Sequence, residues 1–221
     1  MDTPNIDIHT YRRPKQKRGI VKFESLLDTA EKLIESSGIE KFSLYDVAEV
    51  AQVTSGSVYH FFPNIESLFI ALAERHLSAF AHFAKPEDTD EIQNWGDLWR
   101  CLSSQARQYY NLNSVPAMLL LGPAATWTIR KVDVEGNRRI AKAVAEQMNL
   151  YFQMPGYPGL EDHLLRAITI SDALWRFSYR EHGMITESFW QDSVMASIAY
   201  LQCFYAPMIP AQKALGMGHR C

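Results

Sequence analysis

The chain has 221 residues, of which 47% are hydrophobic and 21% charged, and its formal net charge is −3 at pH 7. This length holds one medium domain or a small domain joined to a larger one, and the apolar content is ample for a core. The charge balance excludes a generally basic surface for nucleic acid, and no apolar run is long enough to predict a membrane-spanning helix.

Residues 1–18 predict a flexible basic arm. Six basic residues and no acidic one lie from Arg12 to Lys22, while Pro4 and Pro14 with few apolar neighbours disfavour regular structure. Such a segment neutralises phosphates and can enter the minor groove of DNA. The alternative is a solvated, disordered tail. Both hold if the segment is disordered in the free protein and becomes ordered on DNA. The basic residues expected to contact DNA here are Arg13, Lys17, Arg18 and Lys22.

Residues 19–64 predict three helices. Apolar residues recur at helical spacing from residue 23 to residue 34, and Gly38 follows as a C-cap. Ser43 and Asp46 have the spacing of a capping box that opens a second, short helix. The first helix also carries an acidic stripe, which we expect to face away from DNA, formed by Glu24, Asp28, Glu31 and Glu35.

The third helix is predicted to begin after Thr54, with Val58 and Phe62 directed to the core. Two short helices packed on a longer one form a helix-turn-helix unit, whose last helix enters the major groove. Gly56 costs about 1 kcal/mol relative to alanine inside a helix, a cost that is understandable where the backbone closely approaches a ligand. The surrounding side chains suit phosphates and base edges. The predicted contacts in this region are Ser43, Thr54, Ser55, Ser57, Tyr59, His60 and Asn64.

Residues 20–70 resemble the DNA-binding domain of the TetR (tetracycline-repressor) family of bacterial transcription regulators. The resemblance implies a homodimeric repressor that a small molecule releases from a palindromic DNA operator, and it implies that Tyr59 contacts a phosphate. The matching positions are Ala30, Gly38, Ser43, Leu44, Val47, Ala48, Ala51, Val53, Gly56, Val58, Tyr59, Phe62, Glu66 and Leu68.

Three positions depart from the family pattern. Gln52 occupies the turn where the family usually has glycine, and it can hold a left-handed conformation at modest cost. Phe61 and Ile65 stand where the family usually has a histidine and a phosphate-contacting lysine, so two customary DNA contacts are missing. Asn64 can cap the next helix and direct its N-terminal amides at a phosphate.

The rest of the chain, residues 65–221, predicts a ligand-sensing and dimerisation domain. No strand-like alternation is sustained, so we expect an all-α fold of about nine helices. Gly136 makes the start of one of these helices uncertain. The expected later helices span about 65–83, 95–109, 114–121, 133–152, 160–182 and 186–205.

Large amphipathic side chains are frequent in this second region. Each alone is typical of a core, but together they suit a cavity for an aromatic or long apolar molecule. Asp172 interrupts an apolar run and could bind a ligand, or pair with Arg176 or with Arg138 or Arg139. The predicted ligand-binding residues are Phe80, Trp99, Leu102, Tyr110, Met118, Trp127, Met148, Phe152, Asp172 and Trp175.

The last predicted helix is apolar over much of its circumference, which favours burial on more than one face. One face can pack on the chain's own core and another on a second subunit, and the family resemblance implies a four-helix bundle between subunits. A purely intramolecular core is the alternative. The predicted dimer interface comprises Trp190, Val194, Ser197, Leu201, Phe204 and Tyr205.

The sequence therefore predicts a ligand-responsive, homodimeric DNA-binding regulator, most simply a repressor. The same fold acting through a protein partner is the alternative. We expect no enzyme activity, because the chain has no phosphate-binding glycine loop, nucleophile elbow or histidine pair at metal-ligand spacing. The widely spaced Cys101, Cys203 and Cys221 are typical of a reducing cytoplasm, and we expect no metal and no cofactor.

Overall fold

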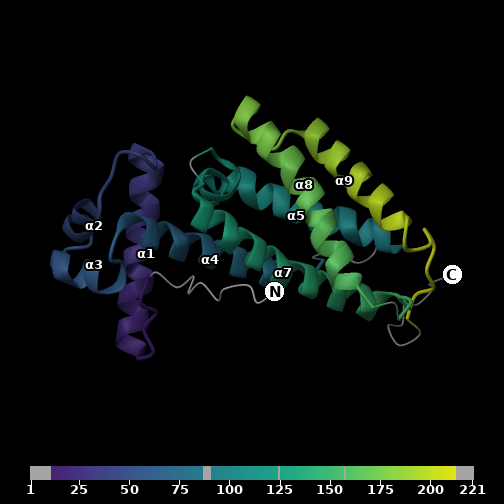
Figure 1. The fold of residues 1–221 in the computed structure, drawn as a ribbon, viewed down its shortest axis with the longest axis horizontal. Helices are drawn as coiled ribbons and strands as arrows, with labels where there is room; N and C mark the ends of the chain where they lie inside the picture. The colour runs from purple at the N-terminus through teal and green to yellow at the C-terminus, as the bar shows by residue number, and fades with distance from the viewer. Residues whose placement is uncertain (1–10, 87–90, 124, 157, 213–221) are drawn as a thin grey trace, which may run out of the picture. The chain divides into compact units, whose positions relative to one another are not determined.

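The computed structural model describes residues 11–86, 91–123, 125–156 and 158–212 (Figure 1). This part of the chain is all-α, as predicted, apart from one isolated bridge between Phe152 and Ala211. Two compact units are present: residues up to His76 together with Asn113–Asp133, and Leu77–Leu112 together with residues from Val134 onward. The domain boundaries predicted after residues 18 and 64 remain predictions.

Helices α1 (Lys17–Ser37), α2 (Leu44–Val50) and α3 (Ser55–Phe61) belong to the first unit. Local signals fix their ends. Gly38 has φ of 84° and its N–H donates to the Ile34 carbonyl at 2.8 Å, which ends α1. The predicted capping box is present, because Asp46 N–H donates to Ser43 Oγ and Ser43 N–H to Asp46 Oδ2. Gln52 adopts the predicted left-handed conformation, with φ of 54°.

Helix α4 (Ile65–Phe83) begins at the predicted residue. Asn64 caps it, since Ser67 N–H donates to Asn64 Oδ1 at 2.8 Å. The first unit also holds α6 (Ser114–Pro116) and the π-helical segment η1 (Ala117–Leu121), so the predicted helix over 114–121 is only partly α-helical.

The second unit contains α5 (Trp95–Leu112), most of α7 (Trp127–Tyr151), α8 (Leu160–His182) and α9 (Glu187–Gln202). Helices α8 and α9 pack side by side (Figure 1), joined by a turn in which Gly183 has φ of 69°. The bounds of α8 agree with the prediction. Helix α9 ends at Gln202, so Phe204 and Tyr205 follow the helix instead of lying on it.

The predicted start of α7 at residue 133 is wrong, because the helix begins at Trp127 and carries Gly136 in its interior. A Cβ added at Gly136 would lie 2.6 Å from Leu77 Cδ1 and 2.8 Å from Leu77 Cβ. Glycine therefore marks a close approach of α7 to α4 instead of a helix boundary.

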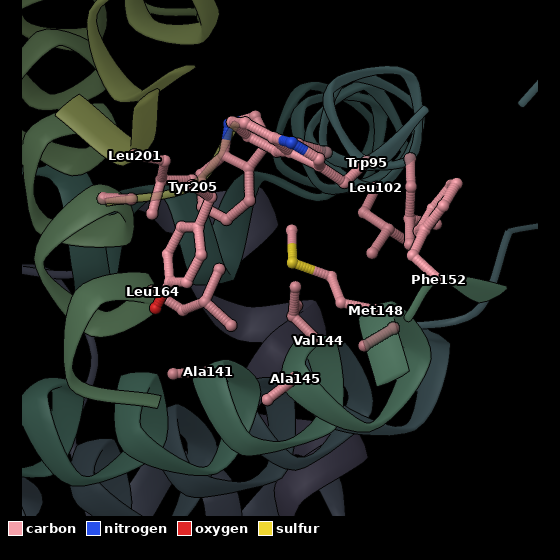
Figure 2. Packing of buried hydrophobic residues seen from close by; sticks show 14 of the residues in the cluster. Trp95, Leu102, Ala141, Val144, Ala145, Met148, Phe152, Leu164, Leu201 and Tyr205 are labelled. Carbon is pink, nitrogen blue, oxygen red and sulfur yellow. The ribbon is translucent and has the colours of Figure 1, made fainter. Parts of the chain in front are cut away.

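Side chains from α5, α7, α8 and the end of α9 converge in the core of the second unit (Figure 2). Figure 2 shows Met148 and Val144 of α7 directed toward Leu102 and Trp95 of α5. Burial of this apolar surface, at roughly 25 cal/mol per Å², is the main stabilising contribution to this unit.

Candidate nucleic-acid interface and regulatory core

Helix α3 separates an inner from an outer face. Val58 and Phe61 are buried, and Phe62 directly after the helix is fully buried, as predicted for Val58 and Phe62. Phe61, which replaces the histidine usual in the family, packs on Phe23 with ring centroids 5.8 Å apart. Phe61 is thus a core residue of the first unit.

The outer face of α3 carries the remaining predicted contacts. Thr54, Tyr59 and His60 are exposed, and Ser55 and Ser57 are half-buried. Thr54 Oγ1 and Ser57 Oγ lie 3.0 Å apart, so these hydroxyls form one hydrogen-bonded pair. Two further predicted contacts serve their own helices as caps, because the side chain of Ser43 accepts from Asp46 N–H and that of Asn64 from Ser67 N–H. The hydroxyl of Ser43 also donates to Asp46 Oδ2 at 2.8 Å, and these bonds lower the pKa of Asp46.

Tyr45 of α2 adds an aromatic residue to this face that the sequence reasoning missed. Its side chain is 63% exposed, and its ring meets that of Tyr59 edge-on with centroids 5.7 Å apart. Desolvation and the neighbouring Tyr45 side chain raise the pKa of Tyr59. An exposed tyrosine on the polar side of the second helix was the available signal.

The structure describes residues 11–18 of the flexible basic arm predicted for residues 1–18, and the flexibility of that arm stays a prediction. Residues 1–10 lie outside the described residues, but Tyr11 is buried and α1 already begins at Lys17. Burial of the Tyr11 ring holds this part of the chain, so the segment after it follows a defined path. Among the predicted DNA contacts, Arg13, Lys17 and Arg18 are exposed and Lys22 is half-buried.

The acidic stripe of α1 meets α4. Arg75 Nη1 lies 2.7 Å from Asp28 Oδ1 and 3.5 Å from Glu24 Oε2, and Arg75 Nη2 lies 2.6 Å from Glu31 Oε2. His76 Nε2 lies 2.7 Å from Glu31 Oε1. Burial opposes ionisation of Glu31, but the hydrogen bonds from His76 and Arg75 outweigh it and lower the pKa of Glu31. Three of the four stripe residues therefore join α1 to α4.

The predicted ligand-binding residues fall into separate groups. Trp99, Leu102, Met148 and Phe152 belong to the apolar core cluster of the second unit (Figure 2). A second group is aromatic, comprising Phe80, Tyr110 and Trp175: the ring centroids of Phe80 and Tyr110 are 4.8 Å apart, and those of Tyr110 and Trp175 are 6.0 Å apart. Met118 and Trp127 belong to the first unit, where Trp127 is 73% exposed and Met118 is half-buried.

Tryptophan–serine hydrogen bonds join α5, α8 and α9. Trp99 Nε1 donates to Ser197 Oγ at 3.0 Å, and Trp175 Nε1 donates to Ser193 Oγ at 2.9 Å. Trp190 Nε1 donates to Ser103 Oγ at 3.1 Å. The polar ends of these indoles are satisfied within the chain, as buried polar groups require. The sequence offered no local signal for these pairs, since the partners are 18 to 98 residues apart.

Asp172 is buried and accepts a hydrogen bond from Asn137 Nδ2 at 2.8 Å. Arg176 Nη2 lies 3.6 Å from Asp172 Oδ2, which is one of the pairings considered from the sequence. Arg138 is exposed and lies 3.5 Å from Glu135. The partner of Asp172 that the sequence did not indicate is Asn137, the residue before Arg138.

The predicted dimer residues occupy two environments. Val194, Ser197, Leu201 and Tyr205 are buried by the chain itself, because the inner face of α9 packs on α5 and α8. Trp190 is half-buried, and Phe204 is exposed with its ring stacked on His163 at 3.8 Å. Of the six residues, only these two keep side-chain surface that the described part of the chain leaves uncovered.

No metal-binding group of three or more His, Cys, Asp or Glu occurs among the residues that the structure describes. Within the same residues, none of the helices has the length and apolar character needed to cross a membrane.

The capping box that opens α2, the turn with Gln52 and the exposed outer face of α3 form a helix-turn-helix unit. Residues 26–72 match the sequence model described as bacterial regulatory proteins, tetR family. The HTH-type transcriptional repressor NemR of Escherichia coli (strain K12) is 37% identical over 57 residues, which are 26% of this chain and 29% of that protein. The match thus spans less than a third of the curated relative. Over residues 26–72 the chain is therefore similar to bacterial regulatory proteins of the tetR family.

Solved structures share the fold over most of the chain. A TetR-family transcriptional regulator from Streptomyces coelicolor has a TM-score of 0.61 at 22% identity, covering 85% of this chain and 99% of that one. SmeT, the repressor of the Stenotrophomonas maltophilia multidrug efflux pump SmeDEF, has a TM-score of 0.53 in its complex with triclosan. That likeness is at 17% identity and covers 83% of this chain and 91% of that one.

Proposed function

We propose that the protein is a homodimeric transcription regulator that represses from a palindromic DNA operator and is released by a small apolar or aromatic molecule. The observation that carries DNA binding is the outer face of α3, where Thr54, Gly56, Tyr59 and His60 are exposed after the turn that joins α2 to α3. In helix-turn-helix proteins this helix enters the major groove and neighbouring hydroxyls contact phosphates.

DNA binding is tested by fluorescence anisotropy with a duplex of the DNA upstream of the protein's own gene, titrated over salt concentration. We expect selective binding with a steep salt slope, because each neutralised phosphate contributes about −0.9 to the slope of log K against log salt. Tyr59→Phe should weaken binding, whereas Tyr200→Phe in the second unit serves as the matched control. Equal affinity of wild type for the promoter and a scrambled duplex would contradict the proposal.

Dimerisation is supported by exposed stripes on α8 and α9. Ala173 and Phe177 on α8 are exposed at i, i+4 spacing, as are Met195 and Ala199 on α9. Met195 is 66% exposed, which is unusual for a large apolar side chain unless a partner covers it. A second subunit on this face would give two copies of α3, which could occupy successive major grooves roughly 35 Å apart.

The dimer is tested by light scattering of the purified full chain, whose monomer mass is 25.3 kDa. We expect wild type at twice this mass. Met195→Glu should shift it toward monomer, because a charge would be buried in an apolar interface. Gln108→Glu, an acidic change at an exposed position of α5, is the matched control. A monomeric wild type at micromolar concentration would contradict the proposal.

The candidate ligand site lies at the aromatic group of Phe80, Tyr110 and Trp175. Asp172 precedes Trp175 by three residues, so both lie on one side of α8, and both are buried. This combination of tilted and edge-on aromatic rings with a buried carboxylate suits an apolar molecule with one polar or cationic group. Asp172 would meet that group, with Asn137 holding the carboxylate in place.

Ligand response is tested by titrating candidate molecules against the DNA complex, beginning with triclosan because a structural neighbour was solved with it. An inducer should weaken operator binding, and operator should weaken inducer binding by the same factor. A coupling of about 1–3 kcal/mol would change affinity about 5- to 150-fold. Helix α4 is the candidate link, since its residues are shared between the two compact units.

The second candidate function is DNA binding with regulation by a protein partner. The satisfied indoles of Trp99, Trp175 and Trp190 favour it, because these side chains have no free donor for a ligand. A regulator of this kind would bind operator DNA unchanged by every small molecule tested and would release it when the partner protein is added.

A further inference from the structure

The residues between Tyr11 and α1 form a short basic loop, Arg12–Gln16, with Arg12, Arg13 and Lys15 all exposed. A basic segment of this composition is ordinarily a solvated tail. Here the chain is held at three places, each by contacts within the first unit.

The first contact is the side chain of Tyr11. Its ring stacks on Phe23 of α1 with centroids 5.7 Å apart at 26°, and it also approaches Phe62 at 6.5 Å. The Tyr11 hydroxyl donates to the carboxylate of Glu74, a buried residue of α4. The start of the loop is therefore inserted between α1, α4 and Phe62, the residue that follows α3.

The second contact joins the loop to α3. The backbone N–H of Arg12 donates to the carbonyl oxygen of Phe61 at 2.9 Å. Phe61 is the last residue of α3, so this bond fixes the loop beside the end of the helix that carries Tyr59 and His60. A basic loop at that position is next to the proposed DNA contacts.

The third contact folds the loop back on α1. A Cβ added at Gly19 would lie 2.8 Å from Pro14 Cβ, closer than real Cβ atoms approach one another. Glycine in the first turn of α1 therefore makes room for Pro14. Since Pro14 has a fixed φ and lies between Arg13 and Lys15, this contact limits the directions those two side chains can take.

We propose that Tyr11 and the Pro14–Gly19 contact are positioning elements of the DNA-binding surface, which hold Arg12, Arg13 and Lys15 beside the end of α3 for the phosphate backbone of DNA. The inference rests on the proposed DNA-binding function. Ordering the loop before binding removes an entropy cost that a free tail pays on binding. Tyr11, Pro14 and Gly19 need not touch DNA themselves.

The experiment is a double-mutant cycle on the full-length protein, with the upstream duplex and a scrambled duplex as probes. The first change is the triple variant Arg12→Gln, Arg13→Gln and Lys15→Gln, which removes the three positive charges of the loop. This should lower the salt slope by about 2.7 per subunit, at about 0.9 for each phosphate contact, and weaken binding at least tenfold. The other change is Gly19→Ala, which displaces Pro14 while alanine remains the better helix former.

We expect Gly19→Ala and Tyr11→Ala each to weaken DNA binding about tenfold. In either variant, the loss of affinity caused by neutralising the loop should be at least threefold smaller than in wild type. Tyr11→Phe, which retains the ring stack, should bind closer to wild type than Tyr11→Ala. Ile34→Ala is the control for lost stability, because Ile34 is fully buried in α1 away from the loop. In that background neutralisation should keep its full effect.

Additive effects in both cycles would overturn the inference, since Tyr11 and Gly19 would then act independently of the loop charges. Unchanged binding in Gly19→Ala and Tyr11→Ala would overturn it as well and leave the proposed function standing. Failure of wild type to prefer the upstream duplex would instead remove the proposed function itself.

Discussion

Gly56 in α3 and Gly136 in α7 are both helical glycines, but their surroundings differ. Glycine costs about 1 kcal/mol relative to alanine in a helix interior, where Gly136 lies, whereas Gly56 is the second residue of α3. Gly136 is buried, and a Cβ there would meet Leu77, so the packing of α4 against α7 accounts for it. Gly56 is exposed with no heavy atom within 4 Å of an added Cβ, so nothing inside the chain requires it.

The comparison shows two uses of the same residue. In the second unit glycine serves the fold by allowing two helices to approach. In the first unit the open space above Gly56 lies on the face proposed to contact DNA, where a missing side chain lets the backbone come close to a phosphate. Alanine at position 136 should therefore lower stability. Alanine at position 56 should raise stability and lower DNA affinity.

The largest expected effect is on stability, from Gly136→Ala. The added methyl group overlaps Leu77, including its Cβ, and overpacking of this kind costs about 1–3 kcal/mol. Urea denaturation of the full chain measures the change, with Gly156→Ala as control because an added Cβ there meets nothing within 4 Å. Unchanged stability would show that Leu77 can turn aside without cost.

Gly56→Ala should have the opposite pattern. We expect stability to rise by up to about 1 kcal/mol, since the site has room for the methyl group and alanine favours the helix. Affinity for the upstream duplex should fall about tenfold, which is about 1.4 kcal/mol. Denaturation and anisotropy on the same sample separate the two effects. An alanine variant that binds DNA as well as wild type would remove the functional explanation of Gly56.

The contact between α1 and α4 predicts a pH dependence. Because the pKa of Glu31 is lowered below its ordinary value of 4.5, its carboxylate contributes stability above about pH 4.5. This contribution is lost as the pH falls through the lowered pKa of the folded state. Glu31→Gln should lower stability at pH 7 and make the acid limb of a pH–stability curve shallower. Glu35→Gln, at an exposed position of the same stripe, should leave the curve unchanged.

The smallest expected effect is that of Tyr45→Phe. This change keeps the edge-on ring contact with Tyr59 and removes one exposed hydroxyl, so DNA affinity should fall less than in Tyr59→Phe, with little change in stability. If Tyr45 acts through Tyr59, the double variant with Tyr59→Phe should lose no more than Tyr59→Phe alone. Additive losses would mean that the two hydroxyls contact DNA independently.

The sequence determined the helix-turn-helix unit and the bounds of α4 and α8. Its signals there are local: the Ser43–Asp46 capping box, Gly38 after α1, and apolar spacing along α8 each act within one or two turns. The left-handed Gln52 was expected from the family resemblance, because it stands where that family usually has glycine. Interactions over so few residues are fixed by the order of the chain.

Only the tertiary structure decided what the aromatic and charged side chains meet. Trp99 finds Ser197 across 98 residues, and Tyr11 finds Glu74 across 63. The apolar circumference of the last helix and the family resemblance predicted Val194 and Leu201 in a dimer interface, whereas packing on α5 and α8 buries them within the chain. Helical periodicity shows that a face is apolar but not which neighbour covers it, because that choice depends on how distant helices pack.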